Sequence, residues 1–281
     1  MKKIKIDYAN FDQKAEYFYS GDKIIHTSVE KLFELLEWEY KLDNNPFVYR
    51  GLEEAKYFLF SSSQRSYIKE ERYLSIKQNE LFSDYESFVM ENISKLRRWN
   101  NGIIDKLFKA NGITENNTLA YLSFMQHHGI ATPLLDFTRN PFIALYFAIS
   151  DHNGTVNYDS GSPLESFFSI YKIYKPTFIH EMFRGFFVAN GFDMNCISYK
   201  ELSNSIGLYL ISNEDEELRL CNNANIINQE GLFYYNHHPF CPLEIKFNLT
   251  VKDLKSDTRI DSRITKDLPK KLAIAGIFIK N

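Results

Sequence analysis

Residues 126–148 read QHHGIATPLLDFTRNPFIALYFA, and this stretch decides how the fold can be built. Gly129 ends a preceding helix, and the apolar run at 134–137 predicts a short buried strand. Asn140 before Pro141 is typical of a helix start, because asparagine caps the first turn and proline fits its first position. The helix expected from Pro141 to Ile149 is apolar almost all round, so we expect it to be deeply buried.

Polar side chains gather at both ends of this strand. Gln126, His127 and His128 close the helix that precedes it. Asp136 and Thr138 stand just before a helix N-terminus, where backbone N–H groups favour anions. Burying such groups unpaired is costly, so they need protein partners or a ligand. Two interpretations stay open: a binding site, or histidines that satisfy helix carbonyls beside an aspartate that orients a loop.

The hydrophobic pattern elsewhere predicts helices in the first half of the chain and strands in the second. The expected helices cover 27–40, 70–98, 103–110 and 118–127, and a strand begins at 47. The later strands are expected at 167–174, 206–211, 226–235 and 243–251, with helices at 177–189 and 267–279. This order favours an α+β fold.

Two shorter motifs could also bind a ligand. Tyr49-Arg50-Gly51 places a fork-shaped guanidinium at a strand end, which suits a pyrophosphate or a carboxylate. The bland alternative is a surface arginine before a turn. In the expected strand at 226–235, period-two alternation places Gln229 and Phe233 on one face and Glu230 on the other. Its alternative is a bulge with a solvent-facing carboxamide.

Composition narrows the class of protein. The 281 residues carry a net charge of −3 and 16% aromatic residues, which suits a globular protein with a dense core or a stacking pocket. Such a chain lacks the positive field of a non-specific nucleic-acid binder. Three cysteines without CxxC spacing predict reduced thiols. With neither a signal peptide nor a long apolar run, we expect a cytoplasmic protein without a membrane partner.

A metal centre is not expected. The histidines and Cys241 could supply ligands, but adjacent histidines point apart and no HExxH motif is present. The chain also lacks a P-loop, a dinucleotide-binding GxGxxG and a GxSxG elbow, which disfavours the enzymes that carry them.

Together these motifs resemble the FRG-domain family, which is named for a (Phe/Tyr)-Arg-Gly motif. Tyr49-Arg50-Gly51 matches that motif, and residues 126–148 match the family's second signature. A Gln-x-Gly-x-Phe motif matches Gln229 to Phe233, and a serine-rich stretch ends at Arg65. The resemblance implies one domain: a helical N-terminal segment (1–46), the FRG core (47–150), a mobile loop (151–163) and a strand-rich half (164–281).

The order of these motifs is also similar to that of the ADP-ribosyltransferase fold, which implies a helix-rich half packed on a mostly antiparallel split sheet. The implied activity is NAD-dependent mono-ADP-ribosylation, with NAD as substrate and no metal. The resemblance also implies a bacterial toxin or phage-defence effector, whose partners would be a protein or nucleic-acid acceptor and an antitoxin.

The resemblance also implies roles for the residues. Arg50 grips the NAD pyrophosphate, and Glu230, Gln229 or Asp136 acts at the ribose. The expected NAD-binding residues are Tyr49, Arg50, Gly51, Arg65, Gln126, His127, His128, Thr138 and Phe233. Two other functions stay open: an NAD glycohydrolase, and a nucleotide- or nucleic-acid-binding module without turnover.

Overall fold

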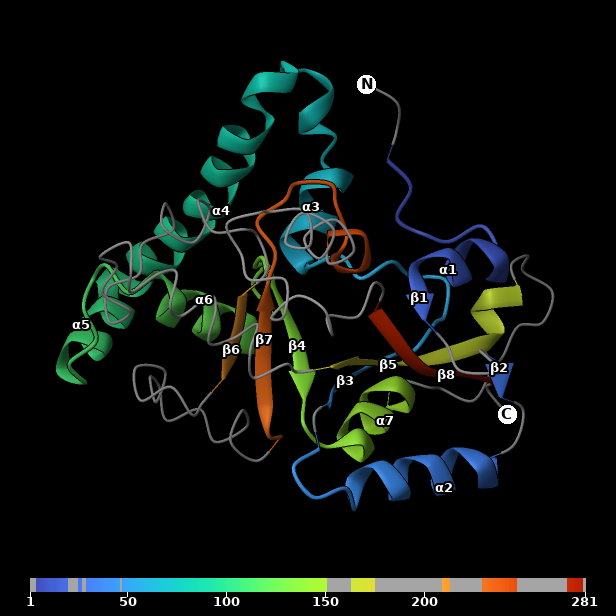
Figure 1. Cartoon of the computed structure of the whole chain (residues 1–281). Coiled ribbons are helices and arrows are strands. Elements are labelled where there is room, and N and C mark those ends of the chain that lie inside the picture. The colour runs from blue at the N-terminus through green and yellow to red at the C-terminus, as the bar shows by residue number, and fades with distance from the viewer. Residues whose placement is uncertain are drawn as a thin grey trace, which may run out of the picture.

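The computed structural model describes residues 4–19, 25–26, 29–45, 47–150, 163–174, 209–212, 229–246 and 272–279 (Figure 1). Its strands form one sheet in the order β1-β8-β5-β3-β4-β7-β6, and β2 also pairs with β8. The strands are β1 (Phe18–Tyr19), β2 (Ile25–His26), β3 (Phe47–Leu52), β4 (Leu134–Thr138), β5 (Phe167–Tyr174), β6 (Tyr209–Ser212), β7 (Gly231–Tyr235) and β8 (Leu272–Ile279). The pairs are antiparallel except for β1 and β2, which run parallel to β8.

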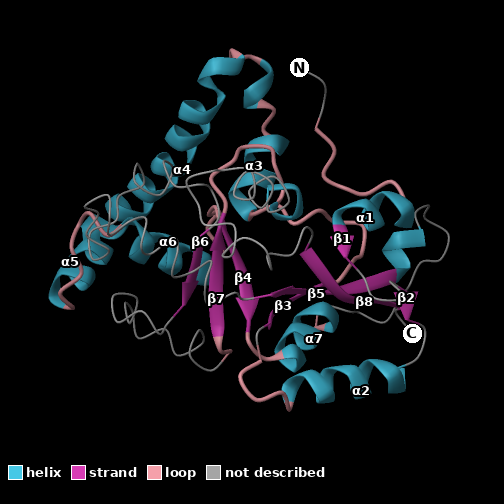
Figure 2. Cartoon of the chain, in the orientation of Figure 1, coloured by secondary structure: helices cyan, strands magenta, loops and turns pink. Residues whose placement is uncertain are grey.

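The sheet is nearly divided between β3 and β4. Its outer pairings are long, with six registered pairs between β3 and β5 and five between β4 and β7. Between β3 and β4 the register holds one pair, Tyr49 with Thr138. The strands on the two sides of this junction run in clearly different directions (Figure 2). The expected α+β class with a mostly antiparallel sheet is therefore confirmed.

The labelled α-helices are α1 (Phe11–Tyr17), α2 (Val29–Tyr40), α3 (Ser62–Lys69), α4 (Leu81–Arg98), α5 (Ile103–Ala110), α6 (Thr118–His127) and α7 (Pro141–Ile149). Helix α7 packs on β3, β4 and β5, and α2 packs on α7. Helix α4 contacts α3, α5 and α6, and α6 contacts β4. The sheet junction thus lies between α2 and α7 on one side and α3, α4 and α6 on the other (Figure 1).

The core is rich in buried tyrosine. Tyr67, Tyr85 and Tyr121 are almost completely buried in the cluster around α3, α4 and α6. Their hydroxyls bond to Asp84, Ser63 and Asp105, so that these large side chains are buried without losing their polar partners. This packing fixes α3 against α4 and so supports the loop that leads from β3 to α3.

The start of α3 shows the local chemistry that ends this loop. Ser61 caps the helix by accepting a hydrogen bond from the backbone N–H of Gln64, and the Gln64 side chain accepts one from the Ser61 N–H. This reciprocal capping box satisfies two backbone donors at the helix N-terminus. The side-chain Nε2 of Gln64 also donates to the backbone carbonyl oxygens of His238 and Cys241. The residues after β7 are thereby tied to α3.

Gly51 is required by packing. A Cβ atom built on Gly51 would lie 1.9 Å from the carbonyl oxygen of Ala144 and 2.8 Å from the amide nitrogen of Ala148. Helix α7 therefore lies directly on the β3 backbone, and a side chain at position 51 would push it away. The glycine of the Tyr-Arg-Gly motif therefore allows α7 to pack closely on β3.

Several sequence-based expectations about elements were wrong. The tail forms the strand β8 and not a helix. Its eight residues are almost all apolar and so show no helical period, and β8 is paired along both edges. Residues 243–246 are helical where a strand was expected. The expected helix at 70–98 is broken into two 3-10 turns, Arg72–Leu74 and Gln78–Glu80, followed by α4. The segments α1 and α3 were missed.

Helix α7 is not deeply buried all round. Ala144, Leu145 and Ala148 face β3, whereas Tyr146 and Ile149 are exposed. A uniformly apolar pattern does not tell which face meets the sheet, and here the small residues do so because the helix approaches Gly51 closely. The expected loop at 151–163, apart from Pro163, and the expected helix at 177–189 lie outside the described residues.

Candidate functional site

A cavity of about 680 Å³ opens where β3 and β4 part. Strand β3 contributes Arg50, β4 contributes Asp136, and the loop after β3 contributes Tyr57 and Phe60. The end of α6, the side of α7 and the start of β7 complete its lining. Segments far apart in the chain therefore meet here because the sheet is open at this junction.

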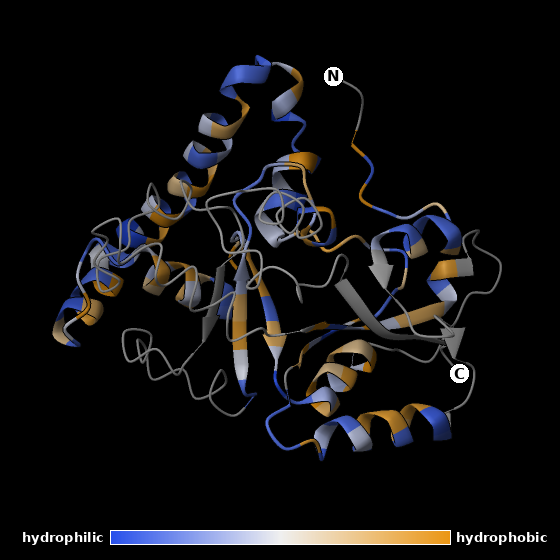
Figure 3. Cartoon of the chain, in the orientation of Figure 1, coloured by the Kyte–Doolittle hydropathy of each residue, from blue (hydrophilic) through white to orange (hydrophobic). Residues whose placement is uncertain are grey.

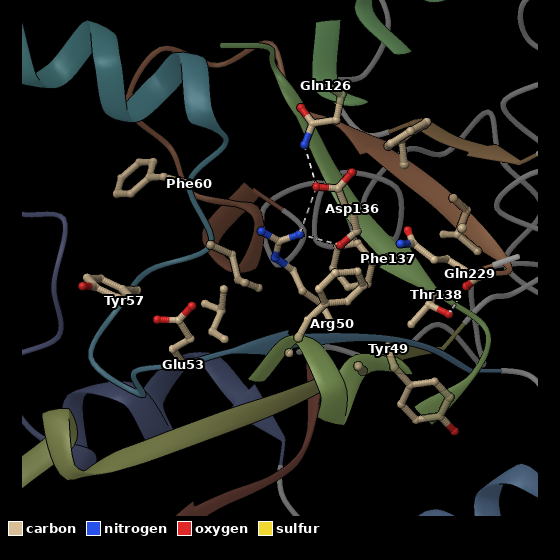
Figure 4. A pocket seen from close by; sticks show the side chains of 18 of the residues that line it. Tyr49, Arg50, Glu53, Tyr57, Phe60, Gln126, Asp136, Phe137, Thr138 and Gln229 are labelled. Atoms are coloured by element: carbon tan, nitrogen blue, oxygen red, sulfur yellow. Dashed lines mark hydrogen bonds and ion pairs between the residues drawn. The ribbon is translucent and has the colours of Figure 1, made fainter. Parts of the chain in front are cut away.

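Arg50 lies at the centre of this cavity (Figure 4). Its Nη1 donates a 2.5 Å hydrogen bond to the backbone carbonyl of Asp136 and lies 3.7 Å from the carboxylate Oδ2. The side chain is 15% exposed, and its Nε is buried without a hydrogen-bond partner among the described residues. Burial lowers the pKa of Arg50, and the Asp136 carboxylate acts in the opposite direction. Arginine stays protonated, so this group is an under-satisfied cation facing a cavity.

Asp136 is held by a short chain of hydrogen bonds. Gln126 Nε2 donates to Asp136 Oδ2 over 2.5 Å, and the Thr132 hydroxyl donates to Gln126 Oε1. The Asp136 side chain is 51% exposed, and its Oδ1 has no protein partner in the described part of the chain. The carboxylate is therefore oriented by Gln126 and still open to a ligand.

A second guanidinium, that of Arg65, also lines the cavity. Its Nη1 donates to the carbonyl of Phe60 over 2.6 Å. Loss of solvation lowers the pKa of Arg65, and the positive charge of Arg50 lowers it further. Two guanidinium groups close enough to repel each other attract an anion with more than one charged oxygen.

Aromatic side chains line the cavity, and they include Tyr49 and Phe233, which were expected from sequence. Tyr49 is fully buried and its ring points away from Arg50, and Phe233 is also buried, so neither is open for stacking (Figure 4). Tyr57 and Phe147 line the cavity and are both exposed. These two rings are the available stacking surfaces.

Gln229 and Glu230 stand in a turn before β7, not on a strand, so the expected alternation of faces does not apply. The Gln229 carbonyl accepts a 2.5 Å hydrogen bond from Thr138, and Gln229 lines the cavity. Glu230 has a left-handed backbone (φ 49°), is exposed and does not line the cavity. The carboxylate expected at the ribose is thus placed outside, and Asp136 is the candidate that lies inside.

The rings of the two histidines at the end of α6 lie 5.0 Å apart, but only one of them reaches the cavity. His127 is exposed and lines the cavity. His128 does not line it, and its ring lies 4.3 Å from that of Phe124. Of the binding residues predicted from sequence, His128 is the one placed away from the cavity, whereas Gln126, Arg65 and Thr138 are brought together with Arg50.

Sequence reasoning missed part of the lining, notably Glu53, Tyr57, Phe60 and Phe147. Glu53 and Tyr57 follow the Tyr49-Arg50-Gly51 motif within a few residues, and this closeness was the available signal. Phe147 could not be found, because it belongs to a helix whose pattern hides its exposed face.

Two searches of the described residues bear on rival kinds of site. They contain no cluster of three or more His, Cys, Asp or Glu side chains that could hold a metal ion. None of the described helices has the length and hydropathy that a membrane span requires.

Comparison with known proteins identifies one family. The family model of the FRG domain matches residues 45–156, from the start of β3 to just beyond α7. The match includes Arg50, Arg65, Gln126 and Asp136, whereas Gln229 lies outside it. No curated protein and no solved structure matches the chain.

Proposed function

Since this chain carries an FRG domain at residues 45–156, we propose that the domain's cavity binds NAD and that the protein is a mono-ADP-ribosyltransferase. The observation that carries the proposal is the pair Arg50 and Arg65 beside the oriented carboxylate of Asp136, in one cavity at the sheet junction. We also propose an ADP-ribosyltransferase-like fold for the chain. The sheet that is nearly divided between β3 and β4 supports this proposal.

NAD fits the charges and the walls of this cavity. Its pyrophosphate presents several anionic oxygens, which the two guanidinium groups can share bidentately. Its two flat ring systems match the exposed faces of Tyr57 and Phe147. The cavity volume of about 680 Å³ lies within the range of small-molecule sites.

In the proposed reaction, the bond between ribose C1′ and the nicotinamide nitrogen breaks. The bonding electron pair leaves with the nitrogen, which converts the pyridinium into neutral nicotinamide and leaves an oxocarbenium-like ribose. The acceptor's nucleophile forms the new bond to C1′ and releases its proton. Asp136, the cavity carboxylate that lies beside Arg50, can stabilise the developing cation or take that proton.

Gln126 then has a role in positioning Asp136. Its amide bond to Oδ2 leaves Oδ1 of the carboxylate turned toward solvent and ligand. Gln229 sits at the opposite side of Arg50 from Tyr57 and is available to bind a ribose hydroxyl (Figure 4). In this arrangement Glu230 takes no part in the chemistry.

A macromolecular acceptor, protein or nucleic acid, completes the proposed reaction. Cleavage of NAD and covalent marking of a cellular component would both harm a cell, which fits a toxin or phage-defence effector in the cytoplasm. An antitoxin that covers the cavity would be its natural partner. When water replaces the acceptor, the same steps make the protein an NAD glycohydrolase.

One observation favours a second candidate, a nucleotide-binding module without turnover. Glu230, the carboxylate expected at the ribose, lies outside the cavity. A site with two arginines, whose Asp136 carboxylate is held by Gln126, can bind a nucleotide without activating it.

Binding and turnover of NAD separate these candidates. Calorimetry with NAD and with ADP-ribose measures binding, and release of nicotinamide measures turnover. We expect Asp136→Asn to bind both ligands within a few-fold of the original protein but to release nicotinamide at least ~100-fold more slowly. Binding without any nicotinamide release by the original protein would establish the binding module.

A further inference from the structure

The end of α4 and the whole of α5 form a basic surface on an otherwise acidic protein. We call residues 95–110 the α5 tip. It carries five basic side chains against one acidic one, Asp105, whereas the whole chain has a net charge of −3. Asp105 is paired with Arg97 over 3.1 Å. The other four cations are exposed and have no ion pair with any described residue: Lys95, Arg98, Lys106 and Lys109.

The α5 tip also exposes large apolar side chains. On α5, Ile104 and Phe108 are buried, and Phe108 packs on Tyr121 of α6. The neighbouring, solvent-facing side of the helix presents Ile103 and Leu107, which are 45% and 50% exposed. Ile103 and Leu107 are one helical turn apart, and Lys106 lies between them in sequence, three residues after Ile103. The outer face is therefore both apolar and basic. Figure 3 shows this mixture of hydrophobic and hydrophilic residues along α5.

Trp99 extends the apolar surface just before α5. It is 61% exposed. Between Trp99 and Ile103 the backbone is left-handed at three successive positions, Asn100 (φ 46°), Asn101 (φ 56°) and Gly102 (φ 71°). Left-handed backbone is costly at the two asparagines, and such cost is often found where a turn serves a function. Here the turn joins a tryptophan to an amphipathic helix at the edge of the molecule (Figure 1).

We infer that the α5 tip docks on the surface of an anionic lipid membrane. Exposed tryptophan and aliphatic side chains bordered by lysine and arginine are the composition of segments that lie in the headgroup region. The unpaired cations supply attraction to acidic headgroups, and the apolar side chains supply insertion. The lack of a long apolar helix does not bear on such a contact, because the docked segment lies on the membrane and does not cross it.

Two other kinds of occupant fit less well. Nucleic acid would use the four cations and could stack on Trp99, but it gains nothing from Ile103 and Leu107. A protein partner needs roughly 800 Å² from each side, whereas the tip is a narrow end of two helices with three large apolar side chains. The combination of charge and aliphatic surface on a small tip favours a lipid surface.

The chain has two tryptophans, and this allows a direct test. Trp38 on α2 is 60% exposed, nearly the same as Trp99, but α2 is rich in glutamate. A Trp38→Phe variant therefore leaves Trp99 as the reporter, and Trp99→Phe leaves Trp38 as the matched control. Each variant is mixed with vesicles of phosphatidylcholine alone, or of phosphatidylcholine and phosphatidylserine in equal parts.

We expect the Trp99 emission to shift to shorter wavelength with the phosphatidylserine vesicles and not with phosphatidylcholine alone. The Trp38 emission should not shift with either vesicle, because α2 is not part of the docked surface. Co-sedimentation of the Lys106→Glu, Lys109→Glu double variant should fall at least ~tenfold, since each cation near an anionic surface contributes to binding. These substitutions are on exposed positions, and circular dichroism checks that the variants fold.

Three outcomes would overturn the inference. The first is no association with either vesicle. The second is association that keeps its strength in the double variant, or shifts Trp38 as much as Trp99. The third is tight binding of single-stranded RNA through Trp99 with no vesicle binding, which would assign the tip to nucleic acid. None of these readouts involves NAD, so they are independent of the proposed function.

Discussion

Arg50 donates a hydrogen bond to the backbone carbonyl of Asp136 and stays 3.7 Å from the carboxylate of the same residue. The carboxylate instead accepts its hydrogen bond from Gln126. The guanidinium and the carboxylate therefore form an ion pair without a hydrogen bond between them. Each can still form hydrogen bonds with a ligand. This relationship is the reason why we place NAD between them.

Replacing Arg50 by lysine tests the bidentate grip. Lysine keeps the charge but loses the planar fork, so we expect the affinity for NAD and for ADP-ribose to fall by ~10-fold or more. Calorimetry measures both. Arg98→Lys, on an exposed position away from the cavity, is the control and should leave the affinity unchanged. An Arg50→Lys protein that binds NAD as tightly as the original would remove this role.

Substituting Gly51 tests the contact between α7 and β3. In Gly51→Ala the new Cβ meets the Ala144 carbonyl at 1.9 Å, so α7 must move. We expect the free energy of unfolding to fall by about 3 kcal/mol or more, the upper end of overpacking costs. Gly112→Ala is the control: Gly112 has a positive φ, unlike Gly51, and nothing lies within 4 Å of its Cβ position. It should cost about 1 kcal/mol. Equal losses in urea unfolding would contradict the packing argument.

The pair His237 and His238 predicts acid sensitivity. Burial, followed by the charge of Lys246, lowers the pKa of each to about 4, below the ordinary value of 6.5. Between pH 6.5 and 4 the unfolded chain therefore binds protons that the folded protein does not, and stability falls as the pH falls. We expect a loss on the order of 2 kcal/mol per histidine across this window.

His238→Asn tests this prediction without removing a needed acceptor. His238 Nδ1 accepts hydrogen bonds from the N–H groups of Phe240 and Cys241, and the asparagine Oδ1 can take the same place. Urea unfolding at pH 7 and pH 5 should show a smaller pH effect for the variant than for the original protein. An unchanged difference between the two pH values would show that His238 does not titrate in this range.

Gln126→Leu tests the positioning of Asp136. Without the amide donor, the carboxylate is expected to turn toward Arg50 and shorten their 3.7 Å ion pair to hydrogen-bond distance. Nicotinamide release should then slow by ~10- to 100-fold, while NAD affinity changes by no more than a few-fold. A parallel loss of rate and affinity would instead indicate that Gln126 contacts NAD itself.

Those residues of the cavity that belong to short sequence motifs could be predicted from the sequence. The stretch at 126–148 predicted a helix end, a strand and a capped helix, and the structure contains α6, β4 and α7 there. Arg50 and Asp136 were both expected at strand positions, and the antiparallel neighbours β3 and β4 bring them together. Local capping and periodicity are short-range, so they were sufficient for these elements.

What failed depends on contacts between distant segments. Glu230 was expected on a strand over 226–235, but β7 begins one residue after it, at Gly231, which pairs with Thr138. The role of Gly51 depends on α7, which follows it by some ninety residues. The strand β8 is a strand because β5 and β1 pair with it, and its own apolar run could not tell this.

Transfer of label from NAD tests the central claim most directly. The purified protein and its Arg50→Ala variant are incubated with adenine-labelled NAD and a cell lysate, and label is followed in protein, RNA, DNA and free ADP-ribose. The account predicts label on a macromolecule with the original protein and none with the variant. If the original protein neither consumes nor binds NAD, that result contradicts the account.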